Sequence, residues 1–341
     1  MGGSKIRLLL VDDSALFRNV LVKGVSKDPE IEVVATAADP FDARDKIVEL
    51  EPDVKVCDVV MPKMNGIDFI RRLLPQYPMR VVVISSVSDS VLDAMNAGAI
   101  DFVPKPDLSY GRTTDVFITE LVEKIKIAAK SKIPAVKTVP AAPRAAARVN
   151  PATNKKLIAI GASTGGTDAI YNVLKALPPD IPGVVIVQHI PPVFSKMFAD
   201  RLNNTTPLRV KEAQNGDYLE KGLVLVAPGD RHMRVKKIGD RFKVEVFEGE
   251  KVNGHCPSVD VLFNSVAEAC GPCAVAVIMT GMGEDGARGL LNLRNSGART
   301  IGQDEKSSVV YGMPRAAFEM GAVERQVSLE NIPSAILSAI N

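Results

Sequence analysis

A short apolar run that leads directly into a glycine-rich serine turn constrains this chain more than any other stretch. Residues 157–160 (LIAI) have the length and β-branched content of a buried strand. The turn Gly161-Ala-Ser-Thr-Gly165 follows, and residues 168–174 have helical spacing. This is the arrangement of a nucleophile elbow, in which free N–H groups at the helix start can stabilise an oxyanion. A phosphate-binding loop and a plain tight turn are the alternatives.

Two further strand ends offer partners for a serine nucleophile. The chain has three histidines, and His189 ends the second apolar run of this half. We predict His189 as the general base, with His255 as second candidate and His232 in a structural turn. Asp285 follows a third apolar run and could orient the imidazole. Because parallel strands end at one sheet edge, Ser163, His189 and Asp285 are expected to meet there.

The chain order of these residues, Ser-His-Asp, differs from the Ser-Asp-His order of the α/β-hydrolases, so similar chemistry on a different fold is predicted. The second half also alternates strand and helix, which predicts a mostly parallel α/β domain. Residues 222–227 and 241–247 are expected as extra strands, the latter in a hairpin on one edge.

The first half alternates strand and helix more regularly. Five apolar runs lie between residues 6 and 103, and a last helix is expected over about 114–129. The pattern predicts a doubly wound, five-stranded parallel sheet.

Acidic residues end two strands of this sheet: Asp12 and Asp13 follow the first, and Asp58 ends the third. Clustered carboxylates repel one another and suit a hard divalent cation, which predicts Mg²⁺. Ser85 ends the fourth strand and Lys105 follows the fifth. Together these groups could stabilise a phosphoryl group on Asp58.

Composition narrows the class of protein. The net charge of +2 argues against a dedicated nucleic-acid binder. No apolar run approaches the roughly 18 residues of a membrane span, and no signal peptide is recognisable, so a cytoplasmic protein is predicted.

A stretch rich in proline, alanine and basic residues predicts a linker over 130–153, between domains at 1–129 and 154–341. Cys270-Gly-Pro-Cys273 precedes a strand, so packing and turn chemistry are expected there instead of a redox role.

The first half resembles the receiver domains of response regulators. The resemblance rests on Val11-Asp12-Asp13-Ser14, Asp58 with Met61-Pro-Lys-Met-Asn-Gly66, Ser85, and Lys105-Pro106. It implies that Asp58 accepts a phosphoryl group, that Asp12 and Asp13 hold Mg²⁺, that Ser85 and Lys105 contact the phosphoryl group, and that Phe102 is the switch aromatic. Val60 and Asn65 stand where these relatives often carry acids, which alters the surface presented.

The second half resembles the chemotaxis protein-glutamate methylesterases. The matching motifs are residues 161–166, 188–192, 227–230, 257–260 and 280–286. The resemblance implies hydrolysis of glutamyl methyl esters on chemoreceptor helices, deamidation of receptor glutamines, and phosphorylation by a chemotaxis histidine kinase. It assigns Ser163 as nucleophile, His189 as acid/base, Asp285 as orienting carboxylate and the Met282 N–H as oxyanion donor, with no cofactor for hydrolysis. Cys256 stands where an arginine is frequent.

Two other functional hypotheses compete with the methylesterase prediction. A non-enzymatic regulator would need a DNA-binding or protein-binding second domain, and no helix-turn-helix or basic recognition face follows Lys156. A small-molecule esterase under receiver control would differ only in its substrate. For the methylesterase reading, we expect the unphosphorylated receiver to restrict access of the receptor to Ser163.

Overall fold

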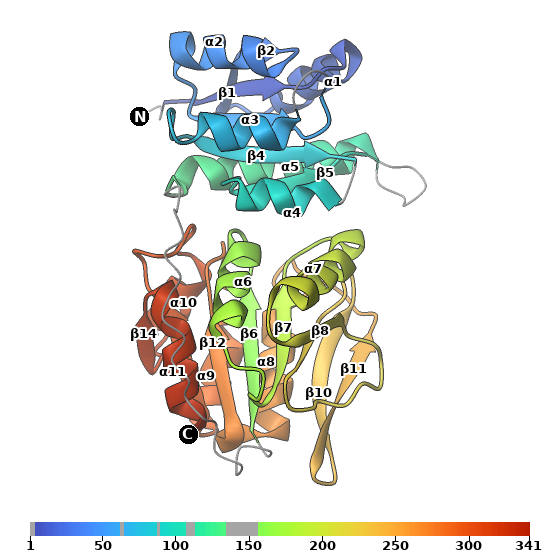
Figure 1. Cartoon of the computed structure of the whole chain (residues 1–341), viewed down its shortest axis with the longest axis vertical. Coiled ribbons are helices and arrows are strands. Elements are labelled where there is room, and N and C mark those ends of the chain that lie inside the picture. The colour runs from blue at the N-terminus through green and yellow to red at the C-terminus, as the bar shows by residue number, and fades with distance from the viewer. Residues whose placement is uncertain (1–3, 62–64, 87–88, 107–112, 134–155) are drawn as a thin grey trace. The chain divides into compact units, whose positions relative to one another are not determined.

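The computed structural model describes residues 4–61, 65–86, 89–106, 113–133 and 156–341. Its contacts divide the chain into two compact units, residues 1–139 and 140–341 (Figure 1). Most of the predicted linker, 134–153, lies outside the described residues, so the domain boundaries stay a prediction. Among the described residues, none of the helices is long and apolar enough to cross a bilayer.

Unit 1 is a five-stranded parallel sheet in the order β2-β1-β3-β4-β5. Helices α1 and α5 pack together on one face, and α2, α3 and α4 follow one another on the other. This confirms the doubly wound sheet. The elements of the unit are β1 (Ile6–Val11), α1 (Ala15–Val25), β2 (Ile31–Ala37), α2 (Pro40–Leu50), β3 (Val54–Asp58), α3 (Gly66–Leu73), β4 (Arg80–Ser85), α4 (Asp89–Asn96), β5 (Asp101–Pro104) and α5 (Thr114–Lys130).

Local signals set the helix starts in unit 1. The Asp39 side chain accepts hydrogen bonds from the N–H groups of Phe41 and Asp42, and Pro40 occupies the first position of α2, as predicted. Ser14 and Thr113 cap α1 and α5 in the same way. The order of the sheet reverses between β1 and β3, and this switch point is where ligands bind in open α/β sheets.

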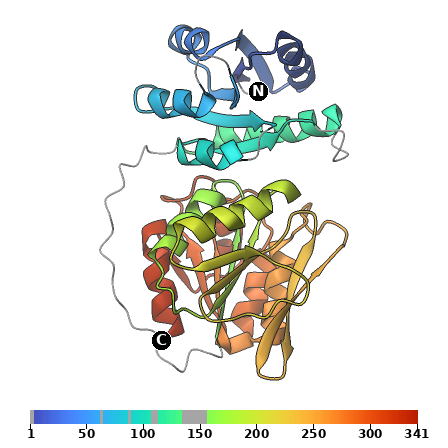
Figure 2. The same cartoon turned by 45° about the vertical axis from the view of Figure 1, so that its right-hand side comes forward.

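Unit 2 is built on a seven-stranded parallel sheet in the order β14-β13-β12-β6-β7-β9-β8. Helices α8, α9 and α10 cover one face, and α6, α7 and α11 the other (Figures 1 and 2). The sheet strands are β6 (Leu157–Ala162), β7 (Gly183–Gln188), β8 (Arg209–Glu212), β9 (Leu223–Val226), β12 (Ala274–Ile278), β13 (Arg299–Gln303) and β14 (Arg325–Val327). The helices are α6 (Gly166–Ala176), α7 (Pro192–Thr205), α8 (Val259–Ala269), α9 (Ala287–Asn295), α10 (Met313–Glu319) and α11 (Ile332–Ile340), with single 3-10 turns at Gly271–Cys273 and Leu329–Asn331.

The hairpin was expected on an edge of the main sheet, and this was wrong. Strands β10 (His232–Ile238) and β11 (Arg241–Phe247) pair with each other as a separate antiparallel sheet that packs on α8. Lys243 of β11 also forms an isolated bridge with Tyr218. Their apolar residues Met233, Val235 and Val244 join the core above α8, which explains the alternation in the sequence. His232 is not in a turn. It begins β10 and is buried, with Nδ1 accepting from the Ser258 N–H.

The Cys270–Cys273 pair ends α8 and precedes β12, as the sequence indicated. The structure joins the two sulfurs in a disulfide, which we had not predicted. The bond closes a loop of two intervening residues, so the unfolded chain loses little freedom and the expected gain in stability is small.

One buried cation lies in the centre of unit 1. Lys55 is on β3 between Leu9 of β1 and Val81 of β4, and its side chain is fully buried. Its Nζ lies 4.1 Å from the centre of the Phe69 ring. No described residue hydrogen-bonds to this amine. Burial therefore lowers the pKa of Lys55 to about 8.

We predict that Lys55→Met stabilises unit 1 at neutral pH. The folded-state pKa lies below the unfolded value, so the cost of burying the charge is fully present below pH 8 and disappears as the pH rises from about 8 to 10.5. That shift corresponds to on the order of 3 kcal/mol. Pulse alkylation of the buried thiol of Cys57 along a urea series should show a higher midpoint for the variant at pH 7, and a smaller difference at pH 10.5. The exposed control Lys27→Met should not shift, and equal midpoints for Lys55→Met and wild type at pH 7 would contradict the prediction.

Candidate functional site

Ser163 lies directly after β6, which runs two residues further than expected, to Ala162. The Ser163 N–H donates to the Thr280 carbonyl at 3.0 Å, and the Ser163 carbonyl accepts from the Gly166 N–H. Positive φ falls on Gly165 (76°), two residues after the serine, while Ser163 is not among the described residues with positive φ. The turn therefore has the layout of a nucleophile elbow, with its unusual backbone angle on the glycine that caps α6.

Close packing explains two glycines around Ser163. A Cβ on Gly281 would lie 2.7 Å from the Ser163 Cβ. A Cβ on Gly166 would overlap the Gln188 side chain, whose amide donates to the Ser163 carbonyl at 2.9 Å. The serine is thus held from β6, β7 and the loop after β12. No described residue hydrogen-bonds to its hydroxyl, which is free to react.

The structure brings His189 and Asp285 into direct contact. His189 follows β7, and its N–H donates to the Ala162 carbonyl at 3.1 Å, beside Ser163. Its Nε2 lies 2.9 Å from Oδ2 of Asp285, which comes from the loop between β12 and α9. Because β12, β6 and β7 are adjacent, the three strand ends that precede Asp285, Ser163 and His189 lie side by side.

Asp285 is nearly inaccessible and accepts several hydrogen bonds. Besides His189, the donors are the Ser258 hydroxyl (2.8 Å), the N–H groups of Val259 (2.7 Å) and Asp260 (3.2 Å), and the Asn253 amide (3.0 Å). Burial acts to raise the pKa of Asp285, but the bonds from His189, Asn253 and Val259 outweigh it and hold the pKa below the usual range. Asp285 is therefore a carboxylate that can only accept.

That charge state fixes the histidine tautomer. An acceptor-only carboxylate requires a hydrogen on Nε2 of His189, so Nδ1 is the basic nitrogen. Nδ1 is buried and has no hydrogen-bond partner among the described residues. It is the ring nitrogen that remains open to accept a proton.

Asn253 was missed in the sequence. Its amide bonds to Asp260 Oδ2 (2.7 Å) as well as Asp285. Asn253 and Gly254 have φ of 52° and 82°, and Val252 and His255 exchange two backbone hydrogen bonds across them. These features are those of a type I′ turn, for which Asn-Gly is the preferred pair. The Asn-Gly dipeptide was the signal that could have located it.

His255, the second candidate base, lies against the first. Its ring stacks on the His189 ring with centroids 3.7 Å apart and planes 12° apart. The Asp285 carboxylate contacts His189 and not His255 in the hydrogen bonds that the structure describes, which favours His189 as the base.

Met282 follows the glycine that packs on Ser163. Its side chain is 43% exposed, and its N–H has no acceptor among the described residues. A free N–H next to the serine suits the predicted oxyanion donor.

Unit 1 gathers acids at its switch point. Ligand oxygens of Asp12, Asp13 and Asp58 lie within 4.8 Å of one another. Lys105 Nζ bridges two of them, at 2.7 Å from Asp12 Oδ2 and 2.6 Å from Asp58 Oδ2. One lysine against three acids leaves net negative charge, and exposed Asp13 opens the cluster to solvent. The donor set fits a hard divalent cation.

Burial and pairing oppose each other at this cluster. Burial raises the pKa of Asp58, against the hydrogen bond from Lys105. Burial also acts against the charge of Lys105, but its bonds to Asp12 and Asp58 outweigh this and raise its pKa. Buried Ser85 ends β4 beside this site, and its carbonyl accepts from the Lys105 N–H. Phe102 lies on β5 with its ring buried.

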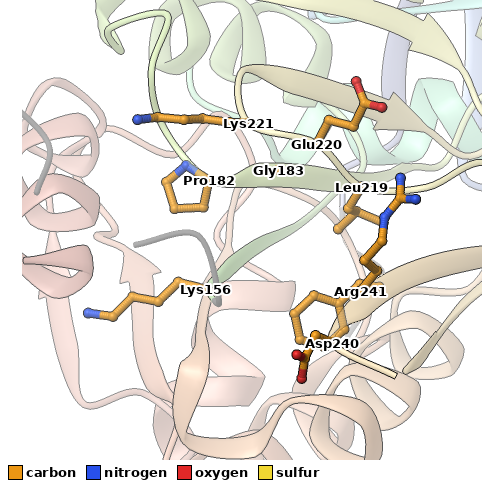
Figure 3. A pocket seen from close by; sticks show the side chains of 9 residues that line it. Lys156, Pro182, Gly183, Leu219, Glu220, Lys221, Asp240 and Arg241 are labelled. Carbon is orange, nitrogen blue, oxygen red and sulfur yellow. The ribbon is translucent and has the colours of Figure 1, made fainter. Parts of the chain in front are cut away.

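A cavity of about 250 Å³ lies at the amino-terminal ends of the unit 2 strands (Figure 3). It opens beside the amino ends of β6, β7 and β9, whereas the serine site is at the carboxyl ends. Lys156 and Lys221 point to one side of it and Arg241 to the other. Among the described residues, no histidine, cysteine or serine lines it, so it is separate from the catalytic candidates.

Together, a receiver-like sheet with an acid cluster and an α/β unit carrying serine, histidine and aspartate define a response regulator with a hydrolase unit. The family model described as CheB methylesterase matches residues 158–336, and the response regulator receiver domain model matches residues 8–109. The chain belongs to the CheB methylesterase family.

Individual relatives agree with this. A protein-glutamate methylesterase/protein-glutamine glutaminase 2 of Syntrophomonas wolfei is 55% identical over 341 residues, 99% of this chain and 98% of that protein. A protein-glutamate methylesterase/protein-glutamine glutaminase of Syntrophotalea carbinolica is 47% identical, over 99% of this chain and 98% of that protein. The crystal structure of the Thermotoga maritima CheB methylesterase catalytic domain superposes with a TM-score of 0.53 at 35% identity, over 54% of this chain and 97% of that one.

Proposed function

We propose that this protein is a phosphorylation-regulated hydrolase that removes methyl esters from glutamate side chains of chemoreceptors and deamidates receptor glutamines, in chemotactic adaptation. The substrate is a cytoplasmic receptor helix, the phosphodonor is a chemotaxis histidine kinase, and the protein works in the cytoplasm. The observation that supports the proposal is the position of Ser163, His189 and Asp285 after three adjacent parallel strands, with a 2.9 Å contact between His189 and Asp285.

The mechanism follows from the protonation states. Ser163 Oγ attacks the ester carbonyl while His189 Nδ1 takes its proton, and the Met282 N–H donates to the oxyanion. Asp285 stabilises the imidazolium through Nε2. His189 returns the proton to the leaving methoxide, and methanol departs. His189 then activates water, which hydrolyses the acyl-enzyme to glutamate; with an amide substrate the same steps release ammonia.

The acid cluster of unit 1 supports a role in phosphorylation. Asp58 is the proposed acceptor, and Asp12, Asp13 and Asp58 would hold Mg²⁺, which supplies positive charge for the incoming phosphoryl oxygens. Lys105 already bonds to Asp58 and lies where it can contact a phosphoryl group. Ser85 and Phe102, on the neighbouring strands, are the proposed switch residues.

Loss of the nucleophile should abolish hydrolysis. Ser163→Ala should lower turnover of methylated receptor membranes by a factor on the order of 10⁶, His189→Ala by a similar factor, and Asp285→Asn by less. Released methanol measures the rate, and circular dichroism checks the fold. Ser334→Ala, on the exposed side of α11, is the matched control. Near-normal turnover by folded Ser163→Ala would refute the mechanism.

Phosphorylation should depend on Asp58 and on a divalent cation. Labelled phosphoryl transfer from the kinase should fail for Asp58→Ala and for wild type after chelation, and Mg²⁺ should restore it in wild type only. Asp45→Ala, an exposed acid on α2, should be labelled normally. Stable label on Asp58→Ala would point to another acceptor.

The receiver should restrain the hydrolase. A fragment starting near residue 152 should demethylate receptors faster than the unphosphorylated whole chain, since the receiver is proposed to limit access to Ser163. Phosphorylation should accelerate the whole chain and leave the fragment unchanged. A small soluble ester should feel the restraint less than the receptor. Equal receptor rates for fragment and unphosphorylated chain would argue for activation by recruitment instead.

A further inference from the structure

The His189 ring is constrained from two directions. The hydrogen bond from Nε2 to Asp285 fixes one end of the imidazole and leaves rotation about that bond open. The His255 ring, 3.7 Å away and 12° from parallel, lies in van der Waals contact with its face and blocks that rotation. One hydrogen bond and one stacked face together define where Nδ1 points.

The His255 ring is itself held in place by the Asn253-Gly254 turn. Both residues have positive φ, and the turn ends at His255, whose backbone exchanges two 3.0 Å hydrogen bonds with Val252. The Asn253 amide ties the turn to Asp260 at the start of α8 and to Asp285. Asp260 in turn accepts from the Gly289 N–H of α9 at 2.7 Å. The segment that carries His255 is thus anchored on the same carboxylate that binds His189.

We propose that His255 is a positioning residue for ester hydrolysis, acting through His189 and held by the Asn253-Gly254 turn. This rests on the proposed function, in which His189 is the base. Its ring fixes the plane of the His189 imidazole, so that Nδ1 keeps one direction through both proton transfers. Its face also lies against the imidazolium that forms after the first transfer, where a π-system is favourable. Neither effect involves substrate binding.

The consequence is a loss that falls on kcat and not on KM. A misplacement of about 1 Å in a catalytic group costs on the order of 10²-fold in rate. We therefore expect His255→Ala to lower kcat on methylated receptor membranes by about 10-fold to 100-fold, with KM unchanged. His255→Phe supplies a flat ring of similar size without ring nitrogens and should recover most of kcat.

Two more variants separate the effect of the turn backbone from the effect of the Asn253 side-chain amide. Asn253→Gly preserves the positive φ and removes the bonds to Asp260 and Asp285, so it should lower kcat while the turn remains. Val252→Ala removes an exposed side chain that is 37% accessible and keeps the backbone pairing to His255, so it should match wild type.

The experiment measures kcat and KM from released methanol for the whole chain, with Ser163→Ala in parallel and thermal melts to check folding. Loss of kcat in His255→Ala with recovery in His255→Phe supports the proposal. Unchanged kcat in His255→Ala, or a His255→Phe variant as slow as His255→Ala, overturns it. If His255→Ala does not fold, a folded His255→Phe near wild-type kcat supports a stacking role, and a slow one overturns it. An active Ser163→Ala would overturn the proposed function as well, whereas an inactive Ser163→Ala beside an unaffected His255→Ala overturns this inference alone.

Discussion

The buried carboxylate of Asp285 is the interaction on which the geometry of the hydrolase unit depends. It accepts from His189 directly after β7, from Ser258 and Val259 at the start of α8, and from the turn at Asn253. A buried anion without these donors would be strongly destabilising, so the charge enforces the convergence of the segments that supply them. The groups that make the buried carboxylate tolerable also fix the position from which it binds His189.

Unit 1 treats buried acids differently. Asp12 and Asp58 share one lysine, and exposed Asp13 leaves negative charge unbalanced beside them. Because the chain does not fully neutralise this negative cluster, the cluster is suited to bind a positively charged ligand. The two units therefore use buried carboxylates differently. In unit 2, Asp285 is closed off, accepts several hydrogen bonds and holds His189 in place. In unit 1, the acid cluster is open, is only partly neutralised and fits a cation.

The sequence was sufficient to predict contacts that follow from the topology of a parallel sheet. Because parallel strands end at one edge of a sheet, the sequence alone predicts that Ser163, His189 and Asp285 lie close together, and likewise the acids of unit 1. It was insufficient for contacts between loops. The stacking of His255 depends on how a turn between two elements packs. The strands β8 (RVKE), β13 (RTIGQ) and β14 (RQV) each hold a single Val or Ile, so none of them forms an apolar run in the sequence. The hairpin was recognised but misplaced, because alternation specifies a half-buried strand and not which layer it covers.

The adjacency of β6 and β12 in the sheet also has a consequence during synthesis. β6 ends at Ala162 and β12 begins at Ala274, so the serine turn lacks its central neighbour until most of the unit has left the ribosome. Thr280, Gly281 and Asp285 arrive later still. Pairing across such a separation is slow to form and comes after local elements. A nascent chain therefore carries Ser163 and His189 for some time before Asp285 is available to bind the histidine.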